Sequence, residues 1–120
     1  MKVLVTGDRH WKDKKMIKDV LSYLYGIDLI IAGDARGADR LTHEIAKEIG
    51  IPSKEYEARW EKHGKAAGPI RNKAMLDSKP NIVIAFHDNI KESKGTKNMM
   101  EQARKAGVPV YLYNHPKAGS

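Results

Sequence analysis

The sequence has no cysteine and no long apolar run, and both absences narrow the classes of protein it can belong to. Without cysteine, neither a disulfide framework nor a thiolate metal site can form. No apolar run approaches the roughly 18 residues that a membrane-spanning helix needs. The first residues lead straight into an apolar strand and show no signal-peptide pattern. We therefore expect a cytoplasmic protein with no membrane partner.

Acidic residues are in deficit: 15 Asp and Glu face 22 Lys and Arg, for a net charge of +7. Positive potential attracts phosphates, so the balance favours a polyanionic partner, although charge alone does not separate a small nucleotide from nucleic acid. The hydrophobic fraction of 41% and charged fraction of 31% are those of a soluble globular protein. A chain of 120 residues forms one domain with a core of its own.

Short apolar runs alternate with amphipathic segments along the whole chain. The run Leu29-Ile30-Ile31 is continuous, as in strands buried on both faces of a parallel sheet. Met16, Val20 and Leu24 recur at helical spacing. Pro69 is placed at the start of a helix, because proline fits a first helical position. The predicted strands are 3–6, 28–32, 53–58, 81–86 and 108–113, and the predicted helices are 14–25, 37–49, 69–77 and 96–106.

This alternation predicts the α/β fold class: a single Rossmann-like domain of about five parallel strands flanked by helices. Right-handed helical crossovers join consecutive parallel strands in such a fold. The domain spans residues 1–113, and a frayed tail follows over 114–120. Ligands bind at the carboxyl ends of the strands in these sheets, near the switch in strand order. Four loops are expected to meet at that edge.

The loop after the first strand contains Gly7, Asp8, Arg9 and Trp11. Gly7 permits a sharp turn, and Arg9 offers a planar fork for phosphate or carboxylate. Trp11 offers a surface on which a base could stack. The alternative is that Trp11 packs on the first helix and Arg9 pairs with an acid, and this loop alone does not decide between the two.

The loop after the second strand leads directly into a helix. Small residues expose backbone N–H groups there, and the helix N-terminus adds partial positive charge, so the loop is a candidate anion site. The alternative is an ordinary tight turn in which Asp39 caps the helix. The candidate ligand-binding residues of this loop are Gly33, Asp34, Ala35, Arg36, Gly37 and Asp39.

Two further helix starts complete the candidate site. Gly68, Arg71 and Asn72 surround the third helix start, and Lys94, Gly95 and Thr96 surround the fourth. A cation in a first helical turn opposes the helix dipole, so Arg71 there indicates a bound phosphate or carboxylate. The alternative for both segments is a capped helix with solvated side chains.

Catalytic and metal chemistry has no clear signature in the chain. No cluster has metal-ligand spacing, and no P-loop pattern occurs. We therefore predict neither a metal nor a cofactor, and we leave the catalytic residues unassigned. The lysines at 12, 14, 15 and 18 are consistent with a nucleic-acid stripe, although a solvated helix face is the commoner explanation.

Taken in order, these loops resemble those of the SLOG superfamily, which includes the lonely-guy phosphoribohydrolases and the DNA processing protein A family. The greatest similarity is to its small stand-alone branch related to the YspA protein. The resemblance covers nearly the whole chain and implies a Rossmann-like sheet with a pocket for nucleotides or their ribose derivatives. It rests on Gly7-Asp8-Arg9-His10-Trp11-Lys12-Asp13, Gly33-Asp34-Ala35-Arg36-Gly37-Ala38-Asp39, Ala58-Arg59-Trp60, Gly68-Pro69-Ile70-Arg71-Asn72-Lys73-Ala74-Met75 and Gly95-Thr96 followed by Met99.

The lonely-guy enzymes carry a glutamate where this chain has Met99, and Glu101 lies about 200° round the helix from that position. A binding module, acting as a sensor or sequestering protein for a nucleotide-derived ligand, is therefore the first hypothesis. The second is an N-glycosidase or transferase acting at ribose C1, with Asp8, Asp34, Asp39 and Asp88 as candidate acids. Nucleic-acid binding ranks third, because no reading helix is recognised. By analogy with similar domains, a homo-oligomer is also expected.

Overall fold

The computed structural model describes residues 1–116 as one α/β domain built on a five-stranded parallel sheet. The strands lie in the order β3-β2-β1-β4-β5. All four neighbouring pairs are parallel, which confirms the predicted fold class. The strands are β1 (Lys2–Gly7), β2 (Leu29–Gly33), β3 (Ser53–Tyr56), β4 (Ile82–Phe86) and β5 (Val110–Tyr113).

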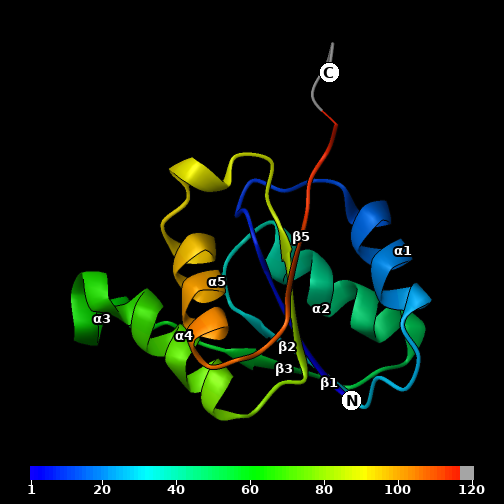
Figure 1. Cartoon of the computed structure of the whole chain (residues 1–120), viewed down its shortest axis with the longest axis horizontal. Helices are drawn as coiled ribbons and strands as arrows, with labels where there is room; N and C mark the ends of the chain where they lie inside the picture. The colour runs from blue at the N-terminus through cyan, green and yellow to red at the C-terminus, as the bar shows by residue number, and fades with distance from the viewer. Residues whose placement is uncertain (117–120) are drawn as a thin grey trace.

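The helices cover both faces of the sheet, with α1 and α2 on one side and α4 and α5 on the other (Figure 1). Two short 3-10 turns, η1 (Gly64–Ala66) and η2 (Ile90–Glu92), lie in the connections. The helices are α1 (Lys14–Tyr23), α2 (Ala38–Ile49), α3 (Trp60–His63), α4 (Ala67–Asp77) and α5 (Gly95–Lys105).

The start of α4 corrects the sequence-based prediction. The helix begins at Ala67, two residues before Pro69. Proline is compatible with this start because the N–H groups of a first helical turn have no intrahelical acceptor, so a missing N–H costs nothing there. Arg71 is therefore the fifth residue of α4 and lies beyond its first turn. The expectation that Arg71 opposes the helix dipole from the first turn is wrong.

Side-chain alternation divides the core into two layers. Val3 and Val5 of β1 pack toward α1 and α2, whereas Leu4 between them packs toward α4 and α5. This period of two buries both faces of the central strands. β1 and β4 lie side by side at the centre, so the switch in strand order falls between them. The loops after these two strands open at the carboxyl edge.

The predicted tail over 114–120 is described as far as residue 116, and residues 117–120 lie outside the described part. His115 is the second residue after β5, and its imidazole contacts Asp13 and Asp88. Among the described residues, no helix has both the length and the apolar character needed to cross a bilayer.

Candidate functional site

The loops after β1 and β2 are packed backbone against backbone. The Ala38 N–H at the start of α2 donates to the Asp8 carbonyl at 3.1 Å. Gly37 has φ of +68°, and a Cβ there would approach the Arg9 carbonyl oxygen to 2.5 Å. Only glycine combines this left-handed backbone with so close an approach. The first two predicted loops therefore form one continuous surface, on which the Arg9 and Arg36 side chains are exposed.

Arg71 lies against the end of β2. Its Nη1 forms an ion pair with Asp34 Oδ1 at 2.9 Å, and its Nε donates to Asn72 Oδ1 at 3.2 Å. The Arg71 side chain is only 12% exposed. A Cβ on Gly33 would collide with Arg71 Nη1 and lie 2.7 Å from Asp39 Oδ2. A glycine at the end of β2 therefore makes room for this buried guanidinium.

Asn72 connects Arg71 to the start of α5. The Asn72 side chain is buried, and its Nδ2 donates to the Gly95 carbonyl at 3.2 Å and to Asn98 Oδ1 at 3.1 Å. The structure thus brings Gly33, Arg71, Asn72 and Gly95 together, as the strand-to-helix rule predicts. Asn98 is a member of this network that sequence reasoning missed, because its partner comes from a distant helix.

Asp39 is buried inside the turn between β2 and α2. Its Oδ2 accepts a hydrogen bond from the Ala35 N–H at 3.2 Å. Burial raises the pKa of the Asp39 carboxyl to about 6, while the neighbouring Arg71 guanidinium opposes part of the rise. This carboxyl satisfies one of the N–H groups that were expected to face an anion. The α2 N-terminus is therefore partly occupied by the protein itself.

The start of α5 is more open. The Ser93 hydroxyl accepts hydrogen bonds from the Thr96 and Lys97 N–H groups at 3.1 and 3.3 Å. Thr96 is buried, whereas Lys94 and Gly95 are exposed, and a Cβ on Gly95 would meet only open space. A ligand can therefore approach α5 at Gly95, while the next two N–H groups are already bonded to Ser93. Ser93, three residues before Thr96, is the capping signal in the sequence.

Trp11 and Gly68 are both buried against other protein groups and do not face an open pocket. Trp11 is 5% exposed and stacks on the His115 ring, with centroids 4.7 Å apart. It offers no open face on which a base could stack, which corrects that interpretation. Gly68 is buried within α4, where an added Cβ would meet Trp60 at 3.4 Å. Trp60 itself is 57% exposed and is an open aromatic surface that the candidate set omitted.

Two histidines that the candidate set omitted also lie at this edge. His43 Nε2 contacts the Gly33 carbonyl at 3.1 Å, and His87 Nε2 lies 4.0 Å from Asp8 Oδ2. Neither pairing has a local sequence signal, because His43 in α2 meets the end of β2, while His87 and Asp8 belong to separate loops. A polar hollow of about 300 Å³ adjoins Asp34 and Ala35 on the His43 side. A larger groove of about 460 Å³ is apolar and lies on α1, β4 and β5.

Comparisons with known proteins agree with the fold and loops. A profile of the YspA, cpYpsA-related SLOG family matches residues 1–63, which carry the first two candidate loops. The chain is also 35% identical over 119 residues to the gene 61 protein of Mycobacterium phage D29. That alignment covers 91% of this chain and 93% of the phage protein. Similarity therefore extends well beyond the segment that the family profile matches.

Proposed function

The chain belongs to the YspA, cpYpsA-related SLOG family, and from this premise we propose that it binds a nucleotide or a nucleotide-derived ribose phosphate. The ligand lies at the carboxyl ends of the strands, and the protein acts as a sensor or sequestering module. The observation that carries the proposal is the Arg71 guanidinium, which lies against the end of β2, pairs with Asp34 and is linked through Asn72 to the start of α5.

Arg71 retains unused donors on its Nη2. Its Nη1 and Nε donate to Asp34 and Asn72, while Nη2 donates to no protein acceptor within residues 1–116. A nearly buried guanidinium with spare N–H donors suits a phosphate oxygen. The first turn of α5 is exposed at Gly95, and the positive end of the helix dipole favours a phosphate there, although Ser93 already accepts from the Thr96 and Lys97 N–H groups. Arg9, Arg36 and Lys94 add exposed positive charge to the surrounding loops.

The acidic side chains of the same edge suit the sugar. Asp8 and Asp34 follow directly after β1 and β2, and their side chains are 28% and 26% exposed. A carboxylate beyond a strand end is a common acceptor for ribose hydroxyls in Rossmann-like sites. In this arrangement the phosphate lies toward Arg71 and α5, while the ribose lies toward the ends of β1 and β2.

Titration calorimetry with AMP, ribose 5-phosphate and inorganic phosphate tests the proposal. Arg71→Ala removes a charged donor worth about 1.5–3 kcal/mol, so we expect affinity for AMP to fall roughly ten- to a hundredfold. Lys73→Ala is the matched control, because it removes one positive charge from the exposed side of the same helix. Equal affinity of the parent and Arg71→Ala for AMP contradicts the proposed site.

Asp39 favours a second candidate function, hydrolysis of the bond between base and ribose. A buried carboxyl with a pKa of about 6 is suited to general acid catalysis near neutral pH. In this reaction water adds its hydroxyl to ribose C1, and the departing base takes up a proton. Chromatographic detection of free adenine from AMP, lost in Asp39→Asn, would support it. If AMP stays intact after prolonged incubation with the parent protein, hydrolysis is excluded and binding is the remaining function.

A further inference from the structure

Trp60 is an exposed aromatic side chain at the carboxyl edge of the sheet. It is the first residue of α3, the short helix that follows β3. Trp60 is 57% exposed, whereas Trp11, the other tryptophan of the chain, is 5% exposed. An indole in water forgoes the free energy of its burial, and tryptophan is enriched where a binding partner covers it. The Trp60 indole is therefore a candidate contact for a ligand.

The indole lies against α4, close to Arg71. A Cβ added to Gly68 would meet Trp60 Cη2 at 3.4 Å, so the edge of the indole rests on α4 at this position. Gly68 precedes Arg71 by three residues and Asn72 by four, which places all three on one face of α4. The indole contact and the Arg71 backbone are therefore separated by about one helical turn, roughly 5 Å along the helix axis.

Asp34 connects the segment that leads into α3 to the same guanidinium. Its Oδ2 accepts a hydrogen bond from the Ala58 N–H at 3.3 Å, and its Oδ1 pairs with Arg71 Nη1 at 2.9 Å. On the other side of Arg71, Asn72 Nδ2 donates to the Gly95 carbonyl at 3.2 Å. Hydrogen bonds therefore run from the start of α5, through Arg71 and the end of β2, to the segment before Trp60. The phosphate, ribose and base of one nucleotide can occupy successive positions along this line.

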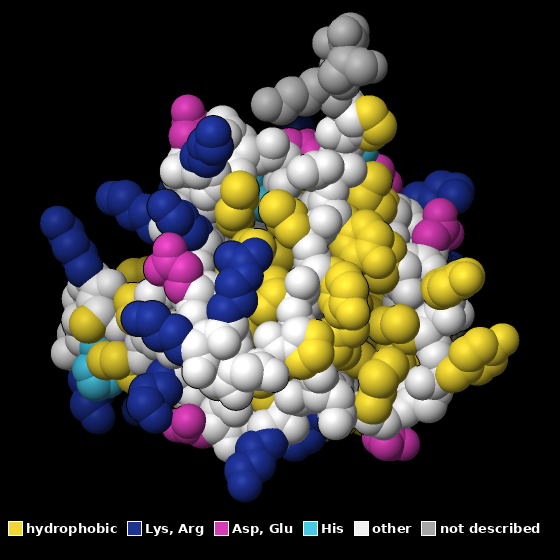
Figure 2. Space-filling view, viewed as in Figure 1, with side chains coloured by type: hydrophobic (Ala, Val, Ile, Leu, Met, Phe, Trp, Pro, Cys, Tyr) yellow, Lys and Arg dark blue, Asp and Glu magenta, His cyan; other side chains and the backbone are white. Residues whose placement is uncertain are grey.

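The charge on this side of the molecule suits an anionic ligand. Residues 59–105 contain 11 Lys and Arg and 5 Asp and Glu, so they contribute +6 of the net charge of +7, whereas residues 1–58 contain ten of each kind. Lysines and arginines gather over α3, α4 and α5 (Figure 2). Arg59, Lys62 and Lys65, which are close to Trp60 in the sequence, are exposed. Positive potential here draws a phosphate-bearing ligand toward the indole and Arg71.

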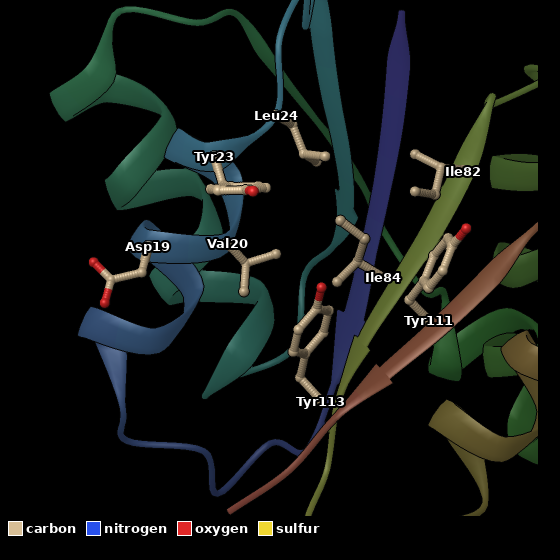
Figure 3. A pocket seen from close by; sticks show the side chains of 8 residues that line it. All are labelled: Asp19, Val20, Tyr23, Leu24, Ile82, Ile84, Tyr111 and Tyr113. Atoms are coloured by element: carbon tan, nitrogen blue, oxygen red, sulfur yellow. The ribbon is translucent and has the colours of Figure 1, made fainter.

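The exposed tyrosines of the molecule do not combine an aromatic face with positive charge. Tyr23, Tyr111 and Tyr113 line the apolar groove between α1 and strands β4 and β5 (Figure 3). Asp19 is the charged residue of its lining, and no lysine or arginine among residues 1–116 lines it. A nucleotide phosphate would find no cation in this groove. Trp60 is therefore the better stacking surface for the base of a nucleotide.

We propose that the Trp60 indole stacks on the base of the bound nucleotide, and that the ligand is a purine nucleotide. The inference rests on the proposed function, because the positions of the phosphate and the ribose come from it. The phosphate lies at Arg71, the ribose at Asp34, and the base over the exposed face of the indole. The fused rings of a purine cover more of the indole than the single ring of a pyrimidine does, so stacking favours a purine.

Titration calorimetry with AMP, UMP and ribose 5-phosphate separates the base from the phosphate. We expect the parent to bind AMP roughly five- to a hundredfold more tightly than ribose 5-phosphate, with UMP between the two. Trp60→Ala should remove this advantage and leave the affinity for ribose 5-phosphate unchanged. Trp60→Phe retains an aromatic face and should keep part of the advantage. Tyr25→Ala is the matched control, because Tyr25 is a 95% exposed aromatic residue between α1 and β2.

Tryptophan fluorescence gives a second readout that a merely structural role would not change. Stacking on adenine quenches the emission of an indole, and Trp11 is buried away from the proposed base position. We expect AMP to quench the emission of the parent and of Tyr25→Ala, and ribose 5-phosphate to have little effect on either. The emission of Trp60→Phe, which comes from Trp11 alone, should not respond to AMP.

The results that would overturn the proposal differ from those that would overturn the phosphate site. Equal affinity of the parent for AMP and ribose 5-phosphate, or an AMP advantage that survives Trp60→Ala, overturns stacking but leaves the phosphate site at Arg71 standing. Trp60→Ala that loses affinity for both ligands alike makes Trp60 a support for Arg71 and also overturns stacking. A parent that binds none of the three probes overturns the proposed function together with this inference.

Discussion

At the scale of single residues, the site depends on a buried carboxyl and a nearly buried guanidinium that lie close together. Arg71 and Asp39 both lie against Gly33. The residues next to each in the sequence do not indicate that its side chain is shielded from solvent. The sequence places Arg71 near the site, because residues at helix starts converge beyond the strand ends. It does not reveal the ion pair with Asp34, which joins residues 37 positions apart. The sequence leaves the role of Trp11 open for a related reason, since its stacking partner His115 comes from beyond the last strand.

Asp39 gives a prediction about pH and stability. Its folded pKa of about 6 lies above the ordinary 3.8, so the folded state binds more protons between those values. Stability from this group is therefore present at about pH 4 and is lost as the pH rises through 6. Two pKa units correspond to about 3 kcal/mol. We expect Asp39→Asn to be more stable than the parent at pH 7.5, by up to that amount.

Urea denaturation at pH 7.5 and 4.5 measures this difference. Near pH 4.5 the gain of Asp39→Asn should largely disappear, because Asp39 is then mostly protonated in the folded parent. A variant less stable than the parent at both pH values would show that the Asp39 carboxylate stabilises the turn. Retaining an ionised carboxyl at such a cost is typical of a functional site.

At the scale of elements, the alternation of apolar runs is enough to predict the five strands and their direction. The order of the strands is harder to predict from the sequence, because after β3 the chain crosses over to form β4 on the other side of β1. α3 (Trp60–His63) was missed since a single helical turn has no periodicity to detect. The start of α4 was placed too late because Pro69 was assigned to the first position, although it fits any position of the first turn.

The junction between β1 and α2 gives a prediction about loop packing. Gly37→Ala places an alanine in a left-handed backbone conformation that strains it, and the new Cβ collides with the backbone of Asp8 and Arg9. Gly50→Ala is the matched control, because Gly50 has φ of +74° but open space around its Cβ position. We expect a loss of about 1 kcal/mol for Gly50→Ala. The loss for Gly37→Ala should be several-fold larger, as measured by urea denaturation, whereas equal losses would mean that the two loops can separate freely.

His115 joins three segments at the end of the sheet. Its ring lies 2.7 Å from Asp13 Oδ2 and 2.9 Å from Asp88 Oδ2. The hydrogen bond to Asp13, followed by that to Asp88, raises the pKa of His115. The contribution of the protonated ring is complete below the ordinary pKa of 6.5 and is lost as the pH rises through the raised value. Hydrogen bonds to His115 lower the pKa of both carboxyls, so the bridge also weakens well below pH 4.

His115→Gln should therefore lower the melting temperature more at pH 5.5 than at pH 9. A neutral imidazole has a single N–H, so at high pH it can donate to only one of the two carboxylates. His63→Gln, a change on α3, controls for the removal of a histidine elsewhere. A melting-temperature loss that is the same at both pH values would mean that the ring acts through its stacking on Trp11 alone.

At the scale of the whole molecule, positive charge is unevenly distributed, and its role can be tested by salt. A pocket that holds one or two phosphates should lose affinity only gently with salt. Duplex DNA binding through many phosphates falls by roughly 10³-fold or more between low and moderate salt. We expect AMP affinity to follow the shallow slope, with no appreciable duplex binding at 150 mM salt. Fluorescence anisotropy with a labelled duplex measures the second quantity, and tight duplex binding that survives Arg71→Ala would favour a nucleic-acid function.

The central claim is that a phosphate-bearing nucleotide binds where the strands end and α5 begins. A titration of the nitrogen-15-labelled protein with AMP, followed by amide NMR spectra, tests it most directly, because each backbone N–H reports its own surroundings. We expect the largest shifts at Gly33, Ala35, Gly95 and Thr96, and much weaker shifts in Arg71→Ala. Shifts confined to the apolar groove, or none at millimolar AMP, ribose 5-phosphate and phosphate, would contradict it.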